Sequence, residues 1–237
     1  MAALHASVLD DRDRERIARY HRPALRHQHV VARSVVRSAV AHRLGTTAAR
    51  VRLGAERGGR PTVRGPNPRL HLSLSHSFPF VAVATSWDAP VGVDVESIDA
   101  VAMARLERVN IWAPGERDAS CAATVDGRTR LWCAKEAVAK AAGLGVILRF
   151  ASIAAGPGGA VVGPGTVADG PYAVVEGAPA STHRLAVATP GPASVAIVHG
   201  PPRFGAPLDG VFTVTASGTI TTHTVEGAVP REERNVE

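Results

Sequence analysis

The sequence has few aromatic residues and few cysteines, and it contains no long uninterrupted apolar run. Only two cysteines, Cys121 and Cys133, occur among 237 residues, and no second pair or histidine stands at a spacing typical of a zinc site. We therefore expect both thiols to be packing or surface groups. No apolar run approaches the roughly 20 residues that cross a bilayer, so we expect no membrane span.

The first 19 residues do not have the pattern expected of a secretory leader. They lack an apolar stretch after a basic start, and they mix Asp10, Asp11, Asp13 and Glu15 with several arginines. This pattern predicts a cytoplasmic protein.

The charge of the chain is mostly positive. The formal net charge is +6, and the arginines are concentrated in the first 70 residues, which favours polyanionic partners. The basic region has no interleaved aromatic residues for base stacking and no recognisable nucleic-acid-binding pattern, so we expect no nucleic-acid partner. A phosphorylated small molecule or an acidic protein fits the charge equally well.

Hydrophobic periodicity predicts helices mixed with short strands. Residues 17–44, 103–110 and 128–142 have helical spacing, whereas apolar and polar residues alternate as in a strand over 69–75. Strands are also expected at 147–154 and 160–167. Two hairpins are predicted, the first pairing 80–86 with 91–96 through 87–90 and the second pairing 185–189 with 194–199 across 190–192.

Two segments about 100 residues apart resemble each other, which is the mark of an internal repeat. Val-Ala-Val-Ala-Thr at 81–85 reappears as Leu-Ala-Val-Ala-Thr at 185–189, and predicted helices end near Gly45 and Gly145. We therefore predict an α+β fold with two similar halves, each with helices packed on a small antiparallel sheet. The expected divisions are an N-terminal half at 1–102, a C-terminal half at 103–202, and an extension at 203–237 with a hairpin at 211–225 and a loose tail from 230.

Acidic residues form two candidate groups. In Val91-Gly92-Val93-Asp94-Val95-Glu96 the alternation directs Asp94 and Glu96 to one face, about 7 Å apart along the strand; a solvated strand face is the simple alternative. On the helix at 128–142, Glu136 and Lys140 share a face, and an ordinary surface pair is the alternative there. If the two faces meet, three carboxylates converge and require a cation. Oxygen ligands suit Mg²⁺, which leaves positions for substrate phosphate oxygens.

Small polar residues precede these acidic groups. Leu72-Ser73-Leu74-Ser75-His76-Ser77 places hydroxyls and one imidazole at a strand end, where they could bind phosphate oxygens. The sequence contains no Gly-x-Ser-x-Gly, which argues against a serine hydrolase. Arg60 follows two glycines and could reach another phosphate, although an ordinary turn arginine fits equally well.

Taken in order and spacing, these motifs resemble those of the 4'-phosphopantetheinyl transferase superfamily. The segments that carry the resemblance are Gly59-Arg60-Pro61, the serine-histidine run at 72–77, the acidic strand at 91–96, and Trp132-Cys133-Ala134-Lys135-Glu136-Ala137-Val138-Ala139-Lys140 followed by Gly143 and Gly145. The length resembles the longer Sfp-type branch, in which one chain holds two pseudo-symmetric halves. The resemblance therefore implies a monomer with pseudo-twofold symmetry.

The resemblance also implies an activity and its residues. The protein would act as a holo-[carrier protein] synthase, moving the 4'-phosphopantetheine arm of coenzyme A to a serine of an apo carrier protein (acyl, polyketide or peptidyl) and releasing 3',5'-ADP. The implied Mg²⁺ ligands are Asp94, Glu96 and Glu136. The implied coenzyme A contacts are Arg16, Arg60, Ser75, His76, Lys135 and Lys140.

Catalytic roles are implied for Glu136, Lys140 and Glu116. The general base stays open between Glu136 acting directly and Glu116 acting through a water. Glu116 ends the segment Ile111-Trp112-Ala113-Pro114-Gly115-Glu116, which stands where the family has a Phe-rich loop, and Trp112 replaces a phenylalanine there. Two other classes remain: a catalytically inactive coenzyme A-binding or regulatory protein of the same fold, and a basic nucleic-acid binder. The presence of all three carboxylates and Lys140 argues against the inactive form.

Overall fold

The computed structural model describes residues 7–56, 59–65, 69–144, 150–156, 159–162, 170–191, 195–200, 211–214 and 220–223. The predicted loose tail from 230, Gly145 and the second half of the strand expected at 160–167 lie outside these residues. Cys121 is exposed, Cys133 is buried, and both are free, as the sequence analysis expected.

The helical segment expected from residue 17 to 44 consists of two helices, α2 (Asp11–Ala18) and α3 (Pro23–Leu44). Asp10 caps α2, because its Oδ1 accepts a hydrogen bond of 2.9 Å from the backbone nitrogen of Asp13. Pro23 suits the start of α3 because a first-turn residue needs no N–H partner inside the helix. Gly45 ends α3 with a φ of 60°, a left-handed conformation that favours glycine.

Within the described residues, the β structure consists of two five-stranded antiparallel sheets and a separate two-stranded ribbon. The ribbon consists of β1 (Arg52–Ala55) and β2 (Pro61–Arg64). The first sheet has the order β12-β11-β10-β4-β3, with β3 (His71–Ser77), β4 (Phe80–Ser86), β10 (Val195–Gly200), β11 (Val211–Val214) and β12 (Ile220–His223). β11 and β12 pair with each other in antiparallel fashion, in the segment where the sequence predicts a hairpin.

The second sheet has the order β5-β9-β8-β7-β6. Its strands are β5 (Gly92–Ser97), β6 (Ile153–Gly156), β7 (Gly159–Val162), β8 (Gly170–Ala180) and β9 (His183–Thr189). Two helices accompany it, α4 (Ala100–Leu106) and α5 (Val125–Ala142), and short 3₁₀ turns occur at Ala48–Arg50, Ser120–Ala122 and Phe150–Ser152.

The two hairpins predicted for 80–96 and 185–199 are wrong. β4 pairs with β3 and β10, whereas β5 pairs with β9; β9 and β10 therefore also lie in different sheets. After β4 the chain crosses to the second sheet, where β5 is an edge strand. After β9 it crosses back to the first sheet, where β10 lies between β11 and β4. A boundary at residue 102 consequently separates the halves in sequence but does not separate the sheets.

The order of elements supports the internal repeat. The series α3, β1, β2, β3, β4, β5 in the first part is followed by α5, β6, β7, β8, β9, β10 in the second. The matching segments 81–85 and 185–189 fall on β4 and β9, the equivalent strands of the two series. The α+β fold predicted from the sequence, with two similar halves, is confirmed.

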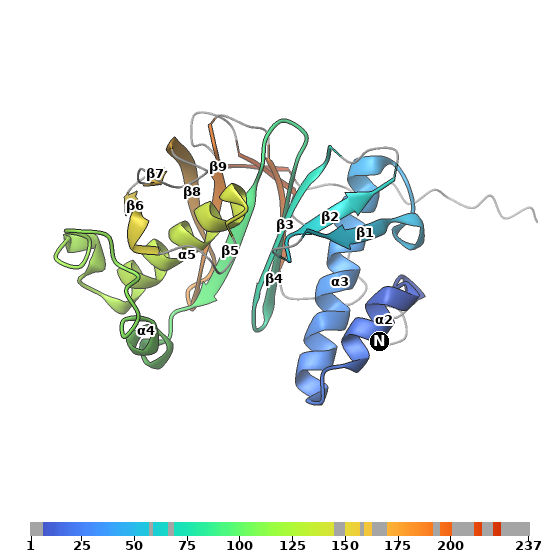
Figure 1. Cartoon of the computed structure of the whole chain (residues 1–237), viewed down its shortest axis with the longest axis horizontal. Coiled ribbons are helices and arrows are strands. Elements are labelled where there is room, and N and C mark those ends of the chain that lie inside the picture. The colour runs from blue at the N-terminus through green and yellow to red at the C-terminus, as the bar shows by residue number, and fades with distance from the viewer. Residues whose placement is uncertain are drawn as a thin grey trace, which may run out of the picture.

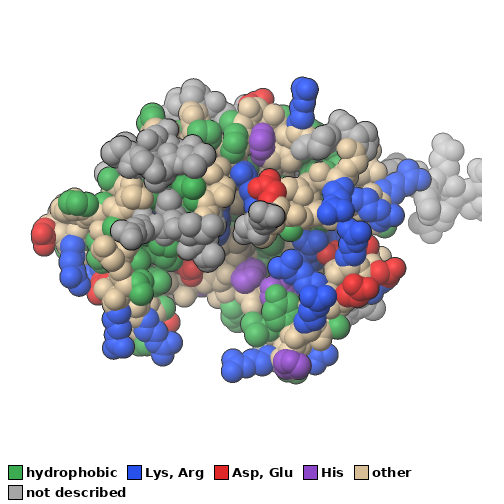
Figure 2. All heavy atoms as spheres, viewed as in Figure 1, with side chains coloured by type: hydrophobic (Ala, Val, Ile, Leu, Met, Phe, Trp, Pro, Cys, Tyr) green, Lys and Arg blue, Asp and Glu red, His purple; other side chains and the backbone are tan. Residues whose placement is uncertain are grey.

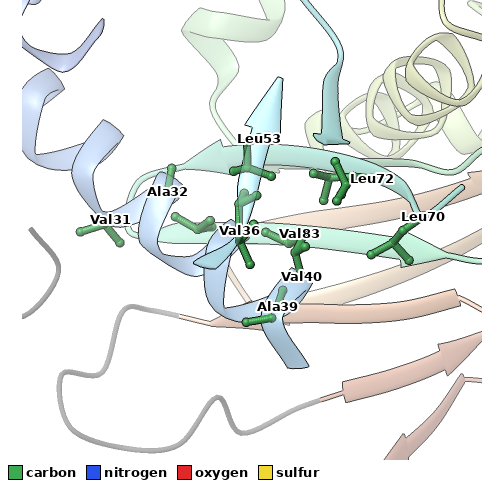
Figure 3. Packing of buried hydrophobic residues seen from close by; sticks show 13 residues of the cluster. Val31, Ala32, Val36, Ala39, Val40, Leu53, Leu70, Leu72 and Val83 are labelled. Carbon is green, nitrogen blue, oxygen red and sulfur yellow. The ribbon is translucent and has the colours of Figure 1, made fainter. Parts of the chain in front are cut away.

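The two sheets lie between α3 and α5 (Figure 1). One core cluster joins α3 and the β1–β2 ribbon to the outer face of the first sheet, and Figure 3 shows Val36 and Val40 of α3 against Leu72 and Val83. A second cluster, which includes Val93 and Val95, fills the space between the sheets. A third, which includes Ala137 and Ala186, packs α5 on the second sheet. The facing strands β3 and β5 place the first sheet beside the second at this central layer.

Candidate functional site

Strand β5 and helix α5 approach each other unusually closely at Gly92. A Cβ atom added there would lie 1.8 Å from the carbonyl oxygen of Ala137, so only glycine allows this contact. Val93 and Val95 belong to the core between the sheets, and strand alternation therefore directs Asp94 and Glu96 to the same side as Gly92, toward α5.

Asp94 is the most buried acidic residue of this region, with 2 % of its surface exposed. Its Oδ1 accepts hydrogen bonds from Ser75 Oγ at 2.8 Å and from Lys140 Nζ at 2.6 Å. Lys140 Nζ also donates to the Val93 carbonyl at 3.1 Å. Asp94 Oδ2 is buried and finds no hydrogen-bond partner within the described part of the chain, which is costly for a carboxylate oxygen.

The negative charge of Asp94 also acts on Glu96 and Glu136. Burial raises the pKa of Glu96 to about 7, with a further contribution from the Asp94 charge. Burial and Asp94 also raise the pKa of Glu136 above its ordinary value. Burial alone would lower the pKa of Lys140, but Asp94 and then the two glutamates raise it. One ammonium group thus faces three carboxylates, and negative charge is in excess.

This arrangement fits a divalent cation in its chemistry. The orphaned Asp94 oxygen and the two carboxyl groups with raised pKa are hard oxygen donors in need of positive charge. Among the residues that the structure describes, however, no three His, Cys, Asp or Glu side chains are gathered as ligands of one ion. Asp94 Oδ1 is bonded to Lys140 instead.

A pocket of about 360 Å³ connects the acidic group to Arg60. Glu136 and Lys140 line one side, and Glu56, Gly59 and Arg60 line the other. The guanidinium of Arg60 donates to the Val91 carbonyl at 3.4 Å, which holds it beside the end of α5. The structure therefore brings Arg60, Glu136 and Lys140 to one cavity.

Ser75 and His76 point in opposite directions, because they are neighbours on β3. The Ser75 hydroxyl is used by Asp94, so it supports the carboxylate rather than standing free for a phosphate. His76 faces α3, where Gln28 Nε2 lies 3.1 Å from its Nδ1. Arg16 is exposed on α2, and its charge acts on nearby His29.

The positions of Lys135 and Glu116 differ from the predicted ones. Lys135 is fully buried and donates to the carbonyl oxygens of Ile111, Phe150 and Ile153, and it pairs with Glu116 at 2.5 Å. We therefore correct the prediction that Lys135 contacts the diphosphate. Successive side chains on a helix point about 100° apart. Lys135 therefore points in a different direction from its neighbour Glu136.

Glu116 is likewise occupied by structural contacts. Its Oε2 accepts from the backbone nitrogen of Ala113 at 2.7 Å, and its Oε1 accepts from that of Ala155 at 2.7 Å. The pair of Glu116 and Lys135 therefore joins the loop before α5 to β6. This replaces the catalytic role predicted for Glu116 with a structural one.

Three residues that the sequence does not mark as functional lie at or next to His76: Gln28 and His29 contact it, and Tyr20 stacks on His29. His29 stacks on Tyr20 with ring centroids 3.9 Å apart and meets His76 edge-on at 5.7 Å. No motif marks these residues, and only their positions on the face of α3 that meets β3 distinguish them. In Figure 2, Lys and Arg side chains gather over the part formed by α2, α3 and the β1–β2 ribbon, and histidines are visible in the hollow between the two halves.

A buried acidic group with one lysine, beside a pocket with an arginine, can accommodate a cation and phosphate groups. The family model of the 4'-phosphopantetheinyl transferase superfamily matches residues 90–160, and the model of the 4'-phosphopantetheinyl transferase N-terminal region matches residues 2–88. The chain belongs to this superfamily, whose members transfer phosphopantetheine. A search of curated proteins found no match.

None of the helices within the described ranges is long and apolar enough to cross a bilayer.

Proposed function

We propose that this chain transfers the 4'-phosphopantetheine arm of coenzyme A to a serine of an apo carrier protein and releases 3',5'-ADP. The carrier would belong to a fatty-acid, polyketide or nonribosomal-peptide system. The protein would act in the cytoplasm as a monomer whose two halves are related by pseudo-twofold symmetry, and neither a membrane nor a nucleic acid would take part.

The observation that carries this proposal is the unmatched charge around Asp94. Its Oδ2 lacks a partner in the described structure, and the pKa values of Glu96 and Glu136 are raised. The same group opens on the pocket that contains Arg60 and Lys140. Cation-binding carboxylates beside two basic side chains suit a diphosphate ester, because each of its phosphates needs positive charge.

Asp94, Glu96 and Glu136 would hold the metal ion, for which we propose Mg²⁺. When bound, the ion would neutralise and orient the diphosphate. Lys140 would bind the phosphate on the leaving side and offset the negative charge that grows there. Arg60, at the other side of the pocket, would bind a further phosphate group of coenzyme A.

In the transfer step, the carrier serine oxygen forms a bond to the phosphorus on the pantetheine side, and the bond from that phosphorus to the bridging oxygen breaks. The serine proton must pass to a base. Glu136 is our candidate, because its carboxyl group lines the pocket in which the diphosphate would lie. Glu116 is not, since backbone nitrogens and Lys135 engage both its oxygens.

Incubation with coenzyme A, Mg²⁺ and an apo carrier protein tests the proposal by mass spectrometry of the carrier. We expect the carrier to gain the mass of one phosphopantetheine arm. Asp94→Asn should slow transfer more than about 100-fold, since loss of groups that merely support metal ligands already costs 10- to 100-fold. Asp11→Asn is the matched control, because Asp11 is 93 % exposed, and it should transfer at the normal rate.

The same incubation separates the other two classes. An inactive coenzyme A-binding protein would bind coenzyme A in calorimetry but leave every carrier of a panel unmodified. A nucleic-acid binder would bind DNA or RNA with strong salt dependence and would not use coenzyme A. Full activity of Asp94→Asn would contradict the proposed three-carboxylate site.

A further inference from the structure

His76 has a hydrogen-bonding partner that the sequence did not indicate. The end of β3 packs against the first turns of α3, so that Gln28 Nε2 lies 3.1 Å from His76 Nδ1, although the two residues are 48 apart in the chain. Both side chains are partly buried. A neutral side-chain amide and an imidazole are thus held together where the end of β3 meets α3.

The chemistry of the amide decides where the imidazole proton sits. An amide nitrogen can only donate, so Nδ1 of His76 must accept, and the proton of the neutral ring is then on Nε2. The two ring nitrogens lie on opposite sides of the imidazole. Since Nδ1 faces α3, the Nε2–H group faces away from α3 and can donate to a group outside.

The surroundings of His76 are basic and aromatic. His29 meets the His76 ring edge-on at an interplanar angle of 88°, and it stacks on Tyr20 at 15°. Burial lowers the pKa of His29, and the nearby His76, Arg16 and Arg33 lower it further. The positive charge of this setting attracts an anion.

We propose that Gln28 is a positioning residue that holds His76 in the Nε2–H form, so that His76 donates to a phosphate group of coenzyme A. This inference rests on the proposed function. Gln28 itself does not touch the substrate. His29, which stacks on Tyr20, contacts the His76 ring from the side, while Gln28 fixes its tautomer. Together they reduce the freedom that coenzyme A binding would otherwise have to remove.

Two variants separate the tautomer from simple packing. Gln28→Leu keeps a helix-forming side chain of similar size but removes the donor. Gln28→Glu keeps the shape and replaces the donor by an acceptor, which requires the proton on Nδ1. We expect ¹⁵N NMR of the free protein to show Nε2–H at His76 in the natural sequence, a mixture in Gln28→Leu, and Nδ1–H in Gln28→Glu.

Kinetics then measure the consequence for the substrate. KM for coenzyme A should rise about tenfold in Gln28→Leu, the amount that corresponds to one hydrogen bond, while kcat changes less than about twofold, because the bond is kept in the transition state. The double variant Gln28→Leu/His76→Leu should be no worse than His76→Leu alone, since Gln28 acts through His76.

Either of two results would overturn the proposal: Nδ1–H at His76 in the natural sequence, or losses from Gln28→Leu and His76→Leu that simply add. If Gln28→Leu does not fold, Gln28→Glu, whose side chain keeps the shape of glutamine, provides the test. If the natural protein transfers nothing, the proposed function fails. The tautomer of His76 and the affinity for coenzyme A in calorimetry still decide the role of Gln28 in that case.

Discussion

Two groups of buried charges differ in their balance. In the first half, Asp13 accepts from Arg33 and Arg37 at 2.6 Å each, and Asp10 pairs with Arg37. Arg37 is fully buried and also donates to the Val51 carbonyl at 2.5 Å. Two carboxylates thus meet two guanidinium groups. Burial alone would raise the pKa of Asp10, but its hydrogen bonds and Arg37 lower it.

At the junction of the halves, three carboxylates meet one ammonium group. There the pKa of Glu96 is raised to about 7, in contrast to the lowered pKa of Asp10. The difference teaches that the charges of the first group balance within the chain and fasten α2 to α3, whereas the second group takes up positive charge from outside, as protons or as a cation. Buried charge by itself therefore does not mark an active site; the unbalanced charge does.

The largest effect should come from breaking the balanced group. Arg37→Met leaves buried carboxylates with fewer partners and should lower the free energy of unfolding by about 3–5 kcal/mol. Urea denaturation measures the loss. Arg33→Met is the matched comparison, because the Arg33 side chain is 19 % exposed, and it should cost less. Equal and small losses in both variants would show that the network does not hold α2 in place.

The unbalanced group should respond to pH in the opposite sense. The Glu96 pKa of about 7 lies above its ordinary value of 4.5, so between these values the folded protein binds more protons than the unfolded chain. With a chelator present, the free energy of unfolding should therefore fall as the pH rises from about 4.5 to 7, with a slope of at most one proton for this residue.

Glu96→Gln should reduce that slope, and Mg²⁺ should reduce it in the natural sequence, because a cation favours the charged carboxylate. Urea denaturation at a series of pH values, with chelator or with Mg²⁺, measures both effects. A slope that is the same in all three cases would indicate that Glu96 does not titrate in this range.

The smallest effect should come from an exposed pair. Arg14 and Asp11 lie 3.1 Å apart with side chains 54 % and 93 % exposed. Arg14→Ala should change the free energy of unfolding by no more than about 0.5 kcal/mol. A loss as large as that of Arg37→Met in the same urea assay would mean that burial does not distinguish these ion pairs.

Local patterns predicted most helices and strands, and they also predicted the acidic face of β5. The alternation around Val93 and Val95 is sufficient to place Asp94 and Glu96 on one side, and the helical spacing places Lys140 one turn after Glu136. Pairing between strands was harder to predict. The short connection at 87–90 suggests a hairpin, but the core between the sheets decides that β5 pairs with β9 instead.

Roles that depend on distant partners could not be derived from spacing. Lys135 stands beside Glu136 in the sequence, yet the carbonyl groups that bind its amine come from residues far along the chain. The contact between Gln28 and His76 spans two elements that no motif connects. Such contacts follow from how α3 and α5 pack on their sheets.

The exchange of strands β5 and β10 makes each half dependent on the other. If the chain were cut between β9 and β10, the first sheet would lose the strand that joins β11 and β12 to β4. A first half isolated from its partner would expose the free edge of β4, and a second half without β5 would expose that of β9. The protein is thus expected to melt in one step, and its fragments should recover a native fold only when they are mixed.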